Sequence, residues 1–133
     1  MASTATLSIT LQWTPPSAAV NSGNVVFSLS ANHNAQNVGQ IDINPSDAPP
    51  TTFVIPFGSI AKAKIAILKN LMSSEISVRL NGAVTDTFVL PANGEFVYAA
   101  SSTPATVPLT AISIITSAAP AAVESVNYYL VGD

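Results

Sequence analysis

The feature that most constrains the fold of this chain is an alternation of apolar and polar residues with a period of two. In residues 6–13 every odd position is Leu, Ile or Trp, and every even position is Thr, Ser or Gln. Residues 25–31 repeat the alternation around Val25, Phe27 and Leu29. Successive side chains of a β-strand point to opposite faces, so this pattern is typical of antiparallel strands with one buried face.

Turn-forming residues divide the rest of the chain into short segments. Three prolines within residues 44–50 interrupt it, because proline cannot donate to a β-ladder. Asn81-Gly82 is a dipeptide typical of a two-residue hairpin, and residues 91–94 form a second turn sequence, Pro-Ala-Asn-Gly. The segments expected to be loops are 32–37, 101–108 and 117–123.

Extended segments lie between these turns. Residues 61–70 contain an unbroken apolar run at 65–68, which suits a helix or a buried strand; the β-branched isoleucines favour a strand, covered on both faces at its C-terminal half. The expected strands are 6–13, 25–31, 40–43, 52–57, 61–70, 75–80, a segment ending at 90, 95–100, 109–116 and 125–131. This pattern predicts an all-β fold, a single antiparallel β-sandwich or jelly-roll-like domain of about nine or ten short strands over residues 1–133, with a flexible end at 1–4.

The scarcity of charge narrows the possible partners. The chain has 4 Lys and Arg, 7 Asp and Glu, no cysteine, and a net charge of −3. So few cations cannot neutralise several phosphates, and we expect no nucleic-acid partner. No apolar run approaches the roughly 20 residues of a membrane-spanning helix, and no signal peptide is apparent, so we expect a soluble protein without a membrane partner.

The polar surface is also unusual in kind. Hydrophobic residues make up 48% and charged residues only 8% of the chain, so the surface is expected to consist mainly of Ser, Thr, Asn and Ala. Such side chains lose little entropy and little hydration when a contact buries them. This composition suits a protein that packs against copies of itself or against a large neighbour.

Candidates for catalysis or metal binding are few. His33 is the only histidine and lies in the polar segment 32–37. The carboxylates are scattered singly; Asp42, Asn44 and Asp47 could ligate calcium, but they lack the acidic density and the glycine of a calcium loop. We therefore expect no enzyme activity, no metal and no cofactor.

All four cations of the chain lie on two consecutive expected strands. Lys62, Lys64 and Lys69 belong to segment 61–70, and Arg79 belongs to segment 75–80. They are expected to form a basic strip, either as protection of a sheet edge or as a docking patch for an acidic protein surface.

Tyr129 is a further interface candidate. The alternation in segment 125–131 points it away from the face that carries Tyr128, and Val131 shares its face, so this strand is expected to be covered on both sides. Exposed aromatic residues could alternatively stack on sugars, and the candidates are Trp13, Tyr98, Tyr128 and Tyr129. The residues expected at an interface are Lys62, Lys64, Arg79 and Tyr129.

A resemblance is carried by residues 64–98. Their segments are IAILKN at 65–70, ISVRLNG at 76–82 and FVLPANGEF at 88–96, and the chain closes with YYLVGD at 128–133. This succession resembles small β-sandwich or jelly-roll virion proteins of tailed bacteriophages. It covers about a quarter of the chain, and its motifs encode hairpins and no ligand site.

The resemblance implies a structural role in a virus particle. The expected function is a capsid decoration, or cement, protein that is made in the host cytoplasm, binds the capsid exterior and bridges shell subunits. Its partners would be the major capsid protein or another virion protein, together with copies of itself, a trimer being common in such proteins. The alternatives are a tail or fibre-associated structural protein and a carbohydrate-binding β-sandwich module.

Overall fold

The computed structural model describes the backbone of residues 3–13, 23–100 and 108–133, and the side chains of 3–10, 26–100 and 108–133. The described residues form ten strands, and all their pairings are antiparallel. The strands are β1 (Ser3–Trp13), β2 (Gly23–His33), β3 (Ala35–Ile43), β4 (Thr52–Val54), β5 (Ala63–Asn70), β6 (Ile76–Leu80), β7 (Phe88–Leu90), β8 (Glu95–Ala99), β9 (Ile112–Thr116) and β10 (Glu124–Gly132). The expected all-β fold is thereby confirmed.

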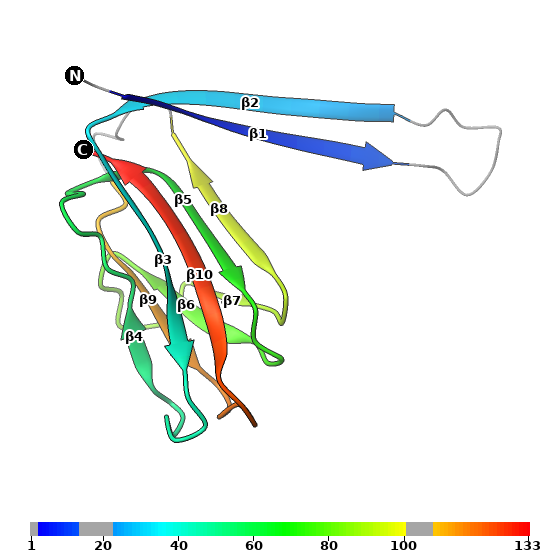
Figure 1. Cartoon of the computed structure of the whole chain (residues 1–133), viewed down its shortest axis with the longest axis vertical. Coiled ribbons are helices and arrows are strands. Elements are labelled where there is room, and N and C mark those ends of the chain that lie inside the picture. The colour runs from blue at the N-terminus through cyan, green and yellow to red at the C-terminus, as the bar shows by residue number, and fades with distance from the viewer. Residues whose placement is uncertain (1–2, 14–22, 101–107) are drawn as a thin grey trace.

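Eight of the strands form a β-sandwich. One sheet has the order β3-β10-β5-β8 and the other β4-β9-β6-β7, and the two sheets pack face to face (Figure 1). The inward-facing side chains of both sheets make one apolar core, as the alternating sequence requires. Its largest buried members include Ile43, Leu68, Met72, Ile76, Ile112, Ile114 and Leu130.

The other two strands leave the sandwich as a long hairpin. β1 and β2 pair only with each other, in continuous register from Ser3 opposite His33 to Trp13 opposite Gly23. We call this ribbon the arm, meaning β1 and β2. The arm crosses one end of the β3-β10-β5-β8 sheet and continues past β8 (Figure 1). A sequence pattern that also suits a core strand therefore belongs to a projecting element.

Several expected boundaries are corrected. Residues 32–37 are not a loop: β2 runs through His33 and β3 begins at Ala35, because Asn32, Asn34 and Gln36 alternate toward solvent while His33 is buried. Residues 3 and 4, expected in a flexible end, are paired with β2. The expected connection 101–108 falls outside the described residues except for its last residue.

The Asn81-Gly82 turn forms as expected, but the hairpin around it is longer. Asn81 and Gly82 both have positive φ, 54° and 72°, and Ala83 N–H donates to Leu80 O at 3.1 Å. These angles match a type I′ turn. β6 and β7 nevertheless pair only from Val78 opposite Phe88 onward. In the described part of the chain there is no helix long and apolar enough to cross a membrane.

Candidate interaction surface of the arm and the sheet beneath it

The arm has one apolar face, and its other face is polar except for Val26, which lies opposite Thr10 and is 57% exposed. Its register places Leu7 opposite Leu29 and Ile9 opposite Phe27, and side chains at alternate positions share a face. On the other face Thr6 and Ser30 are opposite each other, with their hydroxyl oxygens 3.1 Å apart. No Asp, Glu, Lys or Arg occurs before residue 42 of the chain, so neither face of the arm carries a carboxylate, an ammonium or a guanidinium.

The half of the arm nearest the sandwich covers the outer face of the β3-β10-β5-β8 sheet. Ala31 of the arm, Ile65 of β5 and Val131 of β10 are buried together. Leu7, Leu29 and Tyr129 pack against them while remaining partly exposed. The end of β10 is therefore covered on both sides, as expected. In β5 the residue covered on the outer face is Ile65, and the more C-terminal Lys69 is exposed, which corrects the expected position of that cover.

In the half of the arm farther from the sandwich, the two apolar-face side chains that the structure describes are exposed. Ile9 is 43% exposed and Phe27 is 62% exposed. A hollow of about 470 Å³ lies against this face, where Ile9, Phe27 and Leu29 approach Ala99 at the edge of the sheet. An apolar patch with a polar rim marks an interaction site on a soluble protein. This distal half is therefore the candidate contact surface.

Lys64 fixes the arm at its root. Its ammonium donates to Asn32 O at 2.7 Å and forms an ion pair with the carboxylate of Asp133. Two residues farther on, Asn34 N–H donates to Gly132 O at 3.1 Å. The Lys64 side chain is only 11% exposed, so it joins the arm to the end of β10 inside the chain.

The remaining cations do not form the expected basic strip. β5 and β6 lie in different sheets, because the chain crosses the sandwich between them, and so Arg79 is separated from the lysines. Lys69 pairs with Glu95 at 2.9 Å. Among the described residues Lys62 has no carboxylate within 4 Å, and its side chain is exposed.

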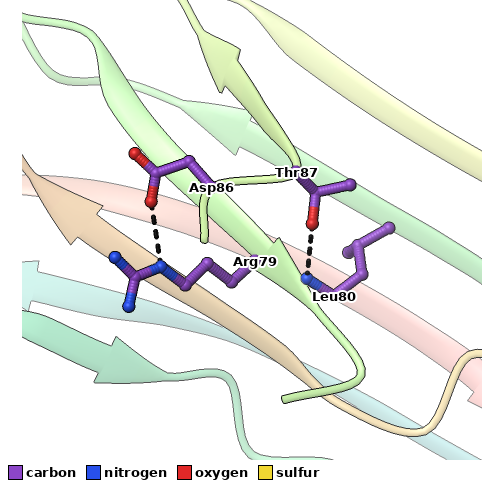
Figure 2. Close-up of polar contacts among 4 residues, drawn as sticks. All are labelled: Arg79, Leu80, Asp86 and Thr87. Atoms are coloured by element: carbon purple, nitrogen blue, oxygen red, sulfur yellow. Dashed lines mark hydrogen bonds and ion pairs between the residues drawn. The ribbon is translucent and has the colours of Figure 1, made fainter. Parts of the chain in front are cut away.

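Arg79 positions the connection between the Asn81-Gly82 turn and β7. Its Nε lies 2.9 Å from Asp86 Oδ1, and Thr87 Oγ1 accepts from Leu80 N–H at 3.1 Å (Figure 2). Hydrogen bonds from Ser77 and Arg79 lower the pKa of Asp86 from its ordinary 3.8. Because Arg79 is paired with Asp86, it positions the loop that follows its own strand. The expected place of Arg79 at an interface stays a prediction.

The described aromatic residues do not form a common exposed platform. Tyr128 is buried in the sandwich core and Tyr98 packs against it, whereas Tyr129 points to the opposite face and contacts the arm cluster. The side chain of Trp13 lies outside the described residues. His33 is buried at the arm root, contrary to the expected polar loop. In the described part of the chain no three His, Asp or Glu side chains come together as a possible metal site.

Comparison with known proteins gave no match: no family model, no curated protein and no solved structure is similar to this chain.

The Lys64–Asp133 contact predicts a pH dependence. The hydrogen bond from Lys64 lowers the folded-state pKa of Asp133 from 3.8, with smaller contributions from the Lys64 charge and the Asn34 N–H. The unfolded chain therefore takes up this proton first, so the contact stabilises the fold above pH 3.8 and the stabilisation is lost as pH falls through the lowered value. Thermal unfolding of D133N should show a lower Tm than wild type at neutral pH, and the two should converge in acid. D42N, far along β3 from the root, is the control that should leave the neutral Tm unchanged; a gap that persists in acid contradicts the assignment.

Proposed function

We propose that this chain is a structural protein of a virus particle, with capsid decoration as its role, and that the arm is its assembly element. The observation that carries the proposal is the distal half of the arm, which projects from the sandwich (Figure 1) and whose described apolar side chains, Ile9 and Phe27, are exposed. A protein that acts alone gains nothing from such a face, because exposed apolar surface favours association. A protein whose function is to attach to other subunits needs an exposed apolar surface for that contact.

The strand order supports a jelly-roll interpretation. Numbered from β3, the eight sandwich strands have the orders 1-8-3-6 and 2-7-4-5 in their two sheets. Eight-stranded jelly rolls are typical of viral capsid and lectin domains. Tyr128 is buried in the core and Tyr98 packs against it, which favours the structural role over sugar binding, because stacking on a sugar requires exposed rings.

The chemistry of the surface supports the same role. Ser, Thr, Ala and Asn side chains lose little conformational entropy when a contact buries them. The arm contains no Asp, Glu, Lys or Arg whose charge would need a partner. An interface of standard size buries about 1,600 Å². If such an interface is repeated at many sites of a shell, the contributions of all sites add to the stability of that shell. The sequence resemblance to phage virion proteins supports the shell as the proposed neighbour, with a tail or fibre as the alternative location.

Fractionation of lysate from the native source on a density gradient tests this function. Quantitative mass spectrometry should find the chain with the particles, at a copy number equal to that of the shell protein or a simple fraction of it. A few copies per particle would indicate a tail or fibre protein instead. Recovery of the chain only from soluble fractions would contradict a virion role.

A further inference from the structure

We infer that the distal half of the arm docks on the sandwich of a second copy of this chain, along a row of apolar side chains on the outer face of β3-β10-β5-β8. The inference rests on the proposed function in one respect, that the arm is an assembly element. It deepens that function by naming the neighbour that the arm contacts. The row is formed by Val38, Tyr129, Ile67 and Val97, and we call it the outer row.

The outer row is straight because the strands are in register. Val38 lies opposite Tyr129, Tyr129 opposite Ile67, and Ile67 opposite Val97. Val38 is 61% exposed, and a hollow of about 410 Å³ lies beside Val38, Ile67 and Tyr129. The row therefore offers apolar surface and a depression in which a side chain can be seated.

The same chain already shows an arm docked on the adjacent row. Val131 lies opposite Ile65, and Ile65 opposite Ala99; the proximal half of the arm covers Val131 and Ile65 of this row, and Ala99 at its end is exposed. The arm's apolar face thus fits the outer face of this sheet, and its distal half continues that face with Ile9 and Phe27. On the far side of the outer row Asn127 lies opposite Lys69, and Lys69 opposite Glu95, so polar residues bound the docking surface.

A second copy is the occupant that fits these observations. The distal half of the arm runs beyond β8 and so beyond its own sheet (Figure 1). Val38 and Val97 of its own outer row are therefore exposed, and Tyr129 and Ile67 between them are half-buried against the proximal half of the arm. Both surfaces are apolar, and the four residues of the row carry no charge, so nothing selects a strongly charged partner. Every copy supplies one arm and one row, and because donor and recipient differ, two copies can exchange arms or several can close a ring.

Matched lysine substitutions test the two surfaces separately in the full chain. F27K places a charge on the apolar face of the arm, and its control S8K places one on the polar face. V38K changes the outer row on the edge strand β3; its control V54K changes an equally exposed valine, 65% against 61%, on the edge strand β4 of the other sheet.

Light scattering after size-exclusion chromatography is expected to give a multiple of 13.6 kDa for the wild type. F27K and V38K should raise the dissociation constant at least about tenfold, as for residues at the centre of an interface, and the controls should leave it unchanged. Mixing F27K with V38K should restore a one-to-one complex, because one retains a working row and the other a working arm.

Cross-linking provides a measurement that does not depend on a disruptive substitution. The chain has no cysteine, so a short bismaleimide reagent should join F27C/V38C into covalent dimers or larger species and leave F27C/V54C uncoupled. A wild-type chain that is monomeric at every concentration overturns the inference, as does assembly that V38K leaves intact. Either result leaves the virion role standing, because that role is decided by the gradient fractions.

Discussion

Replacing Asn70 with Asp is expected to lower the free energy of unfolding by about 3–5 kcal/mol, the loss typical of an uncompensated buried charge. Asn70 is fully buried at the end of β5. Its side-chain amide donates to the carbonyl oxygens of Ser74 and Pro91, each at 2.9 Å, and its Oδ1 accepts from Met72 N–H at 3.0 Å. A carboxylate would keep the acceptor and turn a negative oxygen toward carbonyl oxygens, with no water to solvate it.

Urea unfolding of N70D against wild type measures this loss. N32D is the matched control: Asn32 is exposed, and its Oδ1 accepts from Thr4 Oγ1, a bond that a carboxylate retains, so its effect should stay within about 0.5 kcal/mol. A single ordinary hydrogen bond contributes about 1 kcal/mol. A loss below that value for N70D would show that Asn70 does not hold together the loop after β5, which contains Ser74, and the turn after β7, which contains Pro91.

Replacing Gly132 with Ala is expected to cost about 3 kcal/mol or more, at or beyond the upper end for overpacking. An added Cβ would overlap Lys62 O and lie 2.9 Å from Ala63 Cα, and neither backbone atom can move without breaking the pairing of β10 with β5. This position is the β-bulge at the end of that pairing. Because Gly132 O also accepts from Asn34 N–H, the arm root should loosen together with the strand.

The measurements are urea unfolding and amide hydrogen exchange in β1 and β2. G82A provides the control: its Cβ meets nothing within 4 Å, and only the positive φ of 72° opposes it, at about 1 kcal/mol. Its arm amides should exchange as in wild type. Since Gly132 is not among the glycines with positive φ, a loss in G132A no larger than that in G82A would contradict the assignment of the cost to the contact with Lys62.

The strands could be predicted from the sequence, because a period of two reports directly which side chains share a face. What covers a face is decided by tertiary structure. Residues 6–13 show the same alternation as 125–131, yet one segment projects from the sandwich and the other lies in it. The polar residues 32–37 were misjudged because Asn and Gln fit a strand when they alternate toward solvent.

The candidate surface was less accessible to sequence reasoning. Tyr129 was predicted correctly to face away from the core, and it lies in the outer row. The basic strip was wrong because strand order in a sandwich does not follow chain order, so neighbours in sequence such as β5 and β6 can belong to opposite sheets. One signal for the arm was present in the sequence: the absence of Asp, Glu, Lys and Arg before residue 42.

The attachment of the arm at Asn34 has a consequence for the size of any assembly. A single residue separates β2 from β3, and Lys64 and the buried trio of Ala31, Ile65 and Val131 hold the arm in one direction. That direction sets the rotation that relates a donor to its recipient. If repetition of that rotation returns the last subunit to the first, the assembly is a closed ring with a definite number of subunits. If it does not, the assembly is an open filament. If the arm docks on a second copy as we infer, the symmetry number of that oligomer is set at the arm root, far from the contact between its members.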